Sequence, residues 1–188
     1  SMRMYNSDGT EPEMCGNGIR CLANFVAKMD GAEPKAYKVG TLAGLIQPEV
    51  RADGQVSVDM GEPVLDPPKV PCTFDATQDG AAVRAKIEVD GETWLVTAVS
   101  MGNPHCVTFG KEGQCDDGGI KLDDFALSHY GPMFEKHPTF PAKTNTEFTE
   151  VVNRNYVKMH VWERGAGATL ACGTGACATV VAAVLEGR

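Results

Sequence analysis

Two cysteines in the sequence precede helix-like patterns, and each is followed by a glycine-rich turn. Cys172 precedes Gly173, Thr174 and Gly175, and no side chain from residue 165 to residue 185 is charged. A helix that is uncharged all round is expected to be buried. Its N-terminus presents unpaired backbone N–H groups and a partial positive charge, which should lower the pKa of a thiol and attract a carboxylate. We therefore expect Cys172 to be a reactive thiol at the start of a buried helix.

A second cysteine, Cys15, repeats this arrangement near the start of the chain. It precedes Gly16, Asn17 and Gly18, and apolar residues then recur at helical spacing up to residue 29. An Asp-Gly pair at 30–31 predicts the end of that helix. Because the run at 15–27 parallels the run at 172–182, the sequence predicts two similar halves, each with a cysteine at a helix N-terminus.

Two such thiols could flank one substrate carbon. A thiolate stabilised by a helix N-terminus is a strong base near neutral pH. One sulfur would remove a proton and the other would return a proton to the opposite face, which inverts a stereocentre without a cofactor. Such a site would have to exclude water and stabilise the charge of the carbanion.

The same cysteines admit other interpretations. They could be buried thiols that pack as small hydrophobic side chains. The spacings Cys15–Cys21 and Cys172–Cys177 do not clearly converge on one ion, so we expect no metal site, and the Cys-x-x-Cys of a thioredoxin-type pair is absent. A disulfide between Cys15 and Cys172 that switches the site off is a further hypothesis, because both thiols would flank one small carbon.

Three titratable or charged side chains stand where strands end. His105 follows Gly102 and Pro104, and it is either a structural histidine or a group that holds one thiol deprotonated. Glu163 and Arg164 end a strand and precede a glycine run. They are either a surface ion pair or site residues, in which case Glu163 sets thiol protonation and Arg164 binds a carboxylate with two hydrogen bonds.

Four asparagines are candidate polar anchors: Asn6, Asn17, Asn103 and Asn145. Each could bind an amino or carboxylate group of a substrate, although an asparagine taken singly is more typical of a turn. The sequence leaves both interpretations open.

The pattern of strands and helices that must position these residues predicts two α+β halves. In the first half it predicts, in chain order, an Asp8-Gly9 turn, a strand at 42–50, a hairpin turn at 52–55 and an alternating strand at 56–60. The proline-rich segment 61–71 indicates a crossover, so we divide the chain into half-domains 1–62 and 63–188.

In the second half the pattern predicts, in chain order, hairpin strands at 87–89 and 94–99, a break at 100–107, a loop at 110–119, a helix at 122–130, strands at 148–152 and 157–161, and the helix after Cys172. The helix at 122–130 should stop at Gly131-Pro132, because proline lacks the N–H that a helix interior uses. Asn145 should lie just ahead of the strand at 148–152.

The composition limits the classes of function. A formal net charge of −8 and a pI near 5.0 argue against nucleic acid or an anionic membrane surface as a partner. The longest apolar run, 176–185, is too short to span a bilayer, and no charged-then-apolar leader opens the chain. Seven cysteines without disulfide-like spacing indicate a reducing compartment.

Four motifs together resemble the diaminopimelate epimerase family. They are Asn-Ser-Asp-Gly-Thr-Glu-Pro-Glu-Met-Cys-Gly-Asn-Gly-Ile-Arg-Cys at 6–21, Met-Gly-Asn-Pro-His at 101–105, Thr-Asn-Thr-Glu-Phe at 144–148 and Glu-Arg-Gly-Ala-Gly-Ala-Thr-Leu-Ala-Cys-Gly-Thr-Gly-Ala-Cys-Ala at 163–178. They occur in the family's order over essentially all of the chain, and they are most similar to plant or algal members. Related racemases that act on proline typically carry histidine where Asn17 stands.

This resemblance implies an α+β fold of two pseudo-symmetric half-domains, each a mostly antiparallel sheet wrapped around a central helix, with the site in the cleft between them. It implies a cofactor-independent interconversion of LL- and meso-2,6-diaminoheptanedioate in lysine biosynthesis. By similarity, Cys15 and Cys172 are the acid/base thiols, and His105 and Glu163 tune them. The substrate ligands it implies are Asn6, Gly16, Asn17, Asn103, Asn145, Arg164, Gly173 and Thr174.

The chain departs from the family pattern at both ends. Nothing matches the segments with which family members begin and end, so we expect partial half-domains and a chain that is weakly active or inactive. The alternatives are a racemase of another amino acid and a non-catalytic remnant that binds an amino acid or a partner chain.

The resemblance also sets expectations about surroundings. We expect a small-molecule substrate, no metal, no cofactor, no nucleic acid and no membrane. The expected location is soluble and intracellular: the plastid stroma in a plant or alga, otherwise the cytoplasm. The oligomeric state, a homodimer included, is left open.

Overall fold

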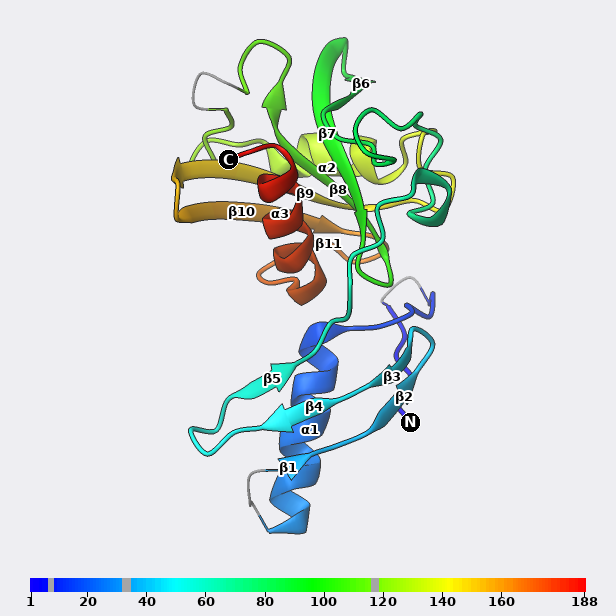
Figure 1. The fold of residues 1–188 in the computed structure, drawn as a ribbon, viewed down its shortest axis with the longest axis vertical. Coiled ribbons are helices and arrows are strands. Elements are labelled where there is room, and N and C mark those ends of the chain that lie inside the picture. The colour runs from blue at the N-terminus through cyan, green and yellow to red at the C-terminus, as the bar shows by residue number, and fades with distance from the viewer. Residues whose placement is uncertain (7–8, 32–34, 116–118) are drawn as a thin grey trace. The chain divides into compact units, whose positions relative to one another are not determined.

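The computed structural model describes residues 1–6, 9–31, 35–115 and 119–188. They form two compact units, Ser1–Glu62 and Pro63–Arg188 (Figure 1). The boundary between the units lies in the proline-rich segment 61–71. Asp8 of the expected Asp8-Gly9 turn, and part of the expected loop at 110–119, fall outside the described residues.

The first unit combines one long helix with short antiparallel strands. Its elements are α1 (Gly16–Asp30), β1 (Lys35–Ala36), β2 (Val39–Thr41), β3 (Gly44–Ile46), β4 (Pro48–Val50) and β5 (Val56–Val58). Strands β1, β4 and β5 form a sheet, α1 packs against β4 and β5, and β2 pairs with β3. Ile19, Ala23 and Ala27 bury the inner face of α1, whereas Met29, at the end of the apolar run, is 74% exposed.

Two local predictions for this unit have opposite outcomes. The predicted end of α1 is confirmed, because Gly31 adopts φ +100° and its N–H bonds the carbonyl of Ala27 in a left-handed cap. The single strand expected at 42–50 is wrong, because β3 and β4 are separate strands in different sheets. The chain turns at 42–43, and Gly44 at φ +109° supplies the backbone conformation that the turn needs.

The second unit is a six-stranded sheet with a helix on each face. Its elements are the 3-10 turn η1 (Pro67–Lys69), β6 (Ala85–Val89), β7 (Glu92–Ser100), β8 (Pro104–Lys111), α2 (Leu127–Glu135), β9 (Asn145–Asn153), β10 (Tyr156–Glu163), β11 (Gly167–Thr169) and α3 (Gly173–Leu185). The strand order is β11-β10-β9-β8-β7-β6, and every neighbouring pair is antiparallel except β8 and β9. In Figure 1, α3 lies in front of this sheet and α2 lies behind it. The expected α+β architecture of mostly antiparallel sheets packed with helices is confirmed.

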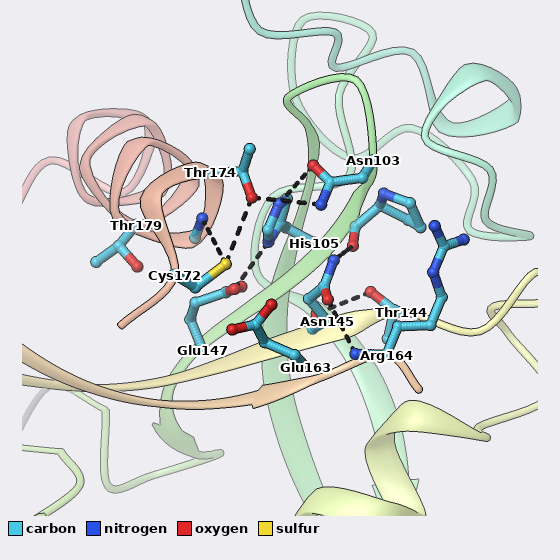
Figure 2. A network of polar contacts seen from close by, with 12 residues as sticks. Asn103, His105, Thr144, Asn145, Glu147, Glu163, Arg164, Cys172, Thr174 and Thr179 are labelled. Atoms are coloured by element: carbon cyan, nitrogen blue, oxygen red, sulfur yellow. Dashed lines mark hydrogen bonds and ion pairs between the residues drawn. The ribbon is translucent and has the colours of Figure 1, made fainter. Parts of the chain in front are cut away.

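Alternation along the strands decides which helix each side chain meets. Trp94, Phe134 and Phe148 pack edge to face in the apolar core on the α2 side, with ring centroids 5.0–6.3 Å apart. His105 and Glu147 are sequence neighbours of core residues and point to the other face, beside the N-terminus of α3 (Figure 2). The apolar core thus supports the sheet from one side, and polar side chains gather on the other.

Helix α2 lies further along the chain than predicted. It spans Leu127–Glu135 and continues through Pro132, so the expected helix at 122–130 and its stop at Gly131-Pro132 are wrong. Tertiary packing outweighs the cost of the proline. A Cβ at Gly131 would come within 2.3 Å of the Trp162 indole, and Phe134 is completely buried, so the helix is held in place by contacts on both sides of Pro132.

The last helix is only partly buried. Ala178 and Ala182 pack inward, but Val180 and Val184 are 58% and 72% exposed, so the expectation of burial all round is wrong. Absence of charge in α3 therefore reflects one buried face and one exposed apolar face. Within the described ranges, no helix combines the length and apolar character needed to cross a membrane.

Two strand boundaries near the candidate residues also differ from prediction. The break expected at 100–107 is confined to 101–103, where Gly102 at φ +87° turns β7 back into β8. Strand β9 begins at Asn145 itself, not after it. Both differences extend regular sheet structure to the residues that were expected in loops, which gives His105 and Asn145 fixed positions on neighbouring parallel strands.

Candidate active site

Each of the two predicted cysteines is the N-cap residue of a helix. Cys15 precedes α1 with φ −135° and ψ 113°, and Cys172 precedes α3 with φ −127° and ψ 112°. The Cys15 sulfur accepts a hydrogen bond from Gly18 N–H at 3.3 Å, and the Cys172 sulfur accepts one from Gly175 N–H at 3.4 Å. A side-chain oxygen of serine, threonine, aspartate or asparagine usually fills this role. The sequence repeat therefore folds twice into one local structure, with a thiol at the cap.

The glycine at the third helical position allows a close approach in each copy. A Cβ at Gly18 would lie 2.6 Å from the Met4 sulfur, and a Cβ at Gly175 would lie 2.5 Å from Glu147 Oε1. Both distances are too short for a real Cβ, so a side chain at either position would displace its neighbour: the flexible Met4 side chain beside Gly18, or the buried Glu147 carboxyl group beside Gly175. The neighbour admitted beside Cys15 is a neutral thioether, and the neighbour admitted beside Cys172 is a carboxyl group.

Cys172 is buried, with 7% of its surface exposed. Burial raises the pKa of its thiol to about 12, and the charges of Glu147 and Glu163 contribute to the rise, while hydrogen bonds with Thr174 and Gly175 N–H oppose it. The expected lowering of this pKa is therefore wrong, because lost hydration outweighs the helix N-terminus. At neutral pH Cys172 is a thiol and hence a proton donor.

His105 is completely buried and both of its ring nitrogens face polar partners. Nδ1 lies 2.7 Å from Glu147 Oε1, and Nε2 lies 3.0 Å from Asn103 Oδ1 (Figure 2). None of the hydrogen bonds found among the described residues joins the ring to a thiol. His105 therefore reaches Cys172 only through other side chains in this unit.

Asn103 and Thr174 connect the histidine to the thiol. Asn103 Nδ2 donates to Thr174 Oγ1 at 3.3 Å, and Thr174 Oγ1 lies 3.4 Å from the Cys172 sulfur. Figure 2 shows the resulting chain of contacts from Glu147 through His105, Asn103 and Thr174 to Cys172. Three segments far apart in sequence, 103–105, 147 and 172–174, thus come together beside the Cys172 sulfur.

Asn145 holds the backbone that carries Arg164. Its Oδ1 accepts from Arg164 N–H at 2.9 Å, and its Nδ2 donates to the Pro104 carbonyl at 2.9 Å. The Arg164 guanidinium donates to the Ala142 carbonyl at 3.3 Å. Glu163 accepts from the Thr169 hydroxyl on β11. Glu163 and Arg164 therefore bond to different neighbours, and the charge of Glu163 acts on Cys172.

The turn after Arg164 is also held from α2. Glu135, 6% exposed, accepts from Trp162 Nε1 at 2.8 Å and from Gly165 N–H at 3.2 Å. This carboxylate fixes the end of β10 on the α2 side, while Asn145 fixes it on the other.

The remaining predicted residues lie in the first unit. Asn6 Nδ2 donates to Thr10 Oγ1 at 3.1 Å, and the Asn17 side chain accepts from Arg20 one turn further along α1. Gly16 and Asn17 form the first turn of α1 directly after Cys15, as Gly173 and Thr174 do in α3 after Cys172. Among the residues that the structure describes, no group of three or more histidine, cysteine or acidic side chains could hold a metal ion.

Sequence reasoning missed Glu147. It stands inside the Thr-Asn-Thr-Glu-Phe motif but was given no role, because the strand there was expected to begin at Phe148. The available signal was its place two residues after Asn145, which puts both side chains on one face of β9.

A family model described as diaminopimelate epimerase matches residues 1–65 and 97–188. The chain is 59% identical over 190 residues to a rice protein named chloroplastic diaminopimelate epimerase, and 57% identical over 188 residues to a diaminopimelate epimerase of Synechocystis. Each alignment covers 100% of this chain but only 52% and 64% of the relative, so the chain spans between half and two thirds of their length.

Solved structures share the fold at low identity. A hydroxyproline epimerase from Agrobacterium vitis superposes with a TM-score of 0.65 at 14% identity, covering 95% of this chain and 54% of that one. A probable proline racemase from Agrobacterium radiobacter gives a TM-score of 0.64 at 14% identity, covering 100% and 59%. At this identity the likeness establishes the fold alone.

Proposed function

This chain belongs to the diaminopimelate epimerase family, and we propose that it carries the two thiols of a cofactor-independent epimerase that interconverts LL- and meso-2,6-diaminoheptanedioate in lysine biosynthesis. The half-domains 1–62 and 63–188 would each supply one thiol. The proposal extends to this chain an activity that is named for its relatives.

One observation carries the proposal. Cys15 and Cys172 cap α1 and α3 with nearly identical backbone angles and the same bond from the glycine N–H three residues on. A structural cysteine needs no such placement. A thiol at a helix N-terminus, with unpaired backbone N–H groups beside it, is placed both to exchange a proton and to lie next to a bound carboxylate.

The proton transfers follow from the two sulfurs. One thiolate removes the α-proton and becomes a thiol, and the opposite thiol gives its proton to the other face of the carbanion and becomes a thiolate. Cys172, with its pKa raised to about 12, starts as the donor. When it loses its proton, the Gly175 N–H and the Thr174 hydroxyl are positioned to stabilise the thiolate. Glu163 and His105 would tune this equilibrium.

The ligand roles divide between backbone and side chains. The first-turn N–H groups at Gly16-Asn17 and Gly173-Thr174 would hold the carboxylate at the reacting carbon. Arg164, Asn103 and Asn6 would bind the remaining polar groups of the substrate. Asn145 uses one amide hydrogen and its oxygen on backbone groups, so we assign it chiefly to holding Arg164 in place.

The test is epimerisation in deuterated water. A chimera in which this chain replaces the matching 190 residues of the rice relative is supplied with LL-diaminoheptanedioate, and product stereochemistry and α-deuterium are measured. We expect conversion to the meso form with one solvent deuterium per inverted centre. L-proline and trans-4-hydroxyproline serve as competing substrates and should not react.

Matched serine variants give the control. Cys15→Ser and Cys172→Ser should abolish turnover, whereas Cys21→Ser and Cys177→Ser, which alter cysteines inside the same two helices, should preserve it. Undiminished epimerisation by Cys172→Ser would refute the two-thiol mechanism. Racemisation of proline but not of diaminoheptanedioate would refute the proposed substrate.

The chloroplast location named for the rice relative leads us to propose the plastid for a plant or algal source.

A further inference from the structure

We propose that Glu135 is a positioning residue for Arg164: its buried carboxyl group, on the α2 side of the sheet, fixes the turn that carries this arginine. The kinetic consequence rests on the proposed function, in which helix N-termini hold the carboxylate at the reacting carbon and Arg164 is left to bind the second carboxylate of the substrate. The structural content is measured without turnover.

The carboxyl group of Glu135 contacts both sequence neighbours of Arg164. Glu135 is the last residue of α2, and its side chain is 8% exposed. Oε2 accepts from Trp162 Nε1 at 2.8 Å, and Oε1 accepts from Gly165 N–H at 3.2 Å. An indole N–H and a backbone N–H can only donate, so the donor and acceptor roles are fixed at both contacts. The chain is therefore held two residues before and one residue after the arginine.

The Trp162 side chain gives this contact a fixed direction. Side chains alternate along β10, so Trp162 faces α2 while Glu163 faces the α3 side, where its charge acts on the thiol. A Cβ at Gly131 would lie 2.3 Å from the indole, and one at Gly167 would lie 3.6 Å from it. The ring thus packs against α2 and β11 at positions without side chains, and its N–H is held toward Glu135.

Arg164 itself is held on the other face of the sheet. Its N–H donates to Asn145 Oδ1 at 2.9 Å (Figure 2), and its guanidinium donates to the Ala142 carbonyl at 3.3 Å. The segment that supplies both acceptors is joined to Glu135 as well, whose backbone carbonyl accepts from Thr144 N–H at 3.2 Å. The end of α2 therefore holds the turn with a side chain and the acceptor segment with its backbone.

A side-chain change at Glu135 would separate these two functions. The backbone bond from Thr144 would remain, whereas Gly165, at φ +76°, would lose the acceptor of its N–H. The guanidinium of Arg164 would then no longer be held at a fixed place relative to the bound substrate. A contact with the second carboxylate is present in both the ground state and the transition state, so weakening it raises KM more than it lowers kcat.

Glu135→Gln is the sharpest variant, because it keeps the shape of the side chain and replaces one acceptor by a donor. Its NH2 group must face either the Trp162 N–H or the Gly165 N–H, and two donors cannot bond. In the double variant Glu135→Gln/Trp162→Phe the indole N–H is absent, so the amide oxygen is free to accept from Gly165. The second substitution should therefore reverse part of the effect of the first.

The structural experiment is nitrogen-15 NMR of the 188-residue chain, which contains two tryptophans. Trp94 Nε1 makes no hydrogen bond among the described residues and serves as the internal reference. We expect Glu135→Gln to shift the Trp162 Nε1–H signal and to speed solvent exchange of the Gly165 N–H by about 10-fold, the change that corresponds to one hydrogen bond. Adding Trp162→Phe should slow that exchange again.

A matched variant separates positioning from a general loss of stability. Glu186→Gln alters another buried carboxyl group, which accepts from the Thr97 hydroxyl at 2.8 Å and pairs with Arg188 at the far end of α3. It should lower the unfolding temperature while the Trp162 signal and the Gly165 exchange rate stay as in the parent. Unchanged Trp162 and Gly165 signals in folded Glu135→Gln overturn the proposal.

The kinetic arm uses the chimera. Glu135→Gln should raise KM for LL-diaminoheptanedioate by about 10-fold, the change expected when one hydrogen bond to a charged group is lost, with kcat nearly unchanged. Glu186→Gln should leave KM unchanged. Adding Glu135→Gln to Arg164→Met should raise KM little further, because both changes act on one contact.

Two kinetic results count against the positioning role. A fall in kcat at constant KM would assign Glu135 to stability alone, and additive increases in KM would show that it does not act through Arg164. A chimera with no turnover before any substitution refutes the proposed function instead, and the Gly165 exchange rates then decide this inference by themselves.

Discussion

Replacing Cys172 by serine and by alanine should separate the structural role of this residue from its chemical role. The Cys172 sulfur accepts from Gly175 N–H at the N-cap of α3. Serine is among the best residues at this position and alanine among the worst, with a difference of about 0.5–2 kcal/mol. Neither side chain can replace the thiol as an acid and base. Stability should therefore follow the order serine above alanine, while both variants lose epimerisation.

The sizes of the two effects can be stated in advance. A cap difference of about 1 kcal/mol should move the unfolding temperature of this unit by roughly 4 °C. Loss of a general acid or base typically costs about 10²–10⁴-fold in rate. Thermal unfolding by circular dichroism measures the first quantity, and deuterium incorporation by the chimera measures the second.

The control pair is Cys177→Ser and Cys177→Ala, on the same helix but inside it. There the order should reverse, because alanine exceeds serine in helix propensity, and both variants should keep their activity. If Cys172→Ala were as stable as Cys172→Ser, the cap assignment would be wrong. If Cys172→Ser turned over substrate, the acid/base assignment would be wrong instead.

Three further predictions concern burial and close packing. Burial raises the pKa of Cys172 to about 12, so as the pH rises the unfolded chain loses the thiol proton before the folded chain does. The free energy of unfolding should therefore fall between about pH 9 and pH 12, and it should fall more in the parent than in Cys172→Ser. Equal slopes of this free energy against pH in the two proteins would contradict the prediction. Gly175→Ala should disturb Glu147, lowering stability by about 1–3 kcal/mol and reducing turnover; an unchanged denaturation midpoint would show that the contact relaxes freely. Gly131→Ala should lower stability by a similar amount, because the added Cβ would clash with Trp162 on the α2 side of the six-stranded sheet. The NMR signals of His105, which lies on the α3 side, should not change. A change in those signals would show that the two faces of the sheet are not independent.

The local signals in the sequence predicted local structure well. The Cys-Gly-x-Gly repeat gave both helix starts, and Asp30-Gly31 gave the end of α1, because capping depends on residues only a few positions apart. The passage of α2 through Pro132 could not be predicted in this way. It depends on Gly131 meeting Trp162, a residue on another element whose position is set only by the folded sheet.

The site was predictable as a set of residue types but not as a network. Cys172, His105 and Glu163 were all named from sequence, whereas Glu147 was not, because its importance comes from burial against His105 and Gly175. The sign of the Cys172 pKa shift was also wrong for the same reason. A helix N-terminus is visible in a sequence, but the loss of hydration around the thiol is not.

This failed expectation makes the proposed mechanism more specific. If both helix N-termini simply lowered the pKa of their thiols, the two cysteines would be alike, yet a two-base epimerase needs one thiol and one thiolate at a time. The backbone around Cys15 and Cys172 is nearly identical, so any difference must come from their neighbours. Met4 lies beside the first turn of α1, and Glu147 lies beside that of α3. The carboxyl group that Gly175 admits adds to the burial that raises the pKa of Cys172, and this makes Cys172 the proton donor in the proposed mechanism.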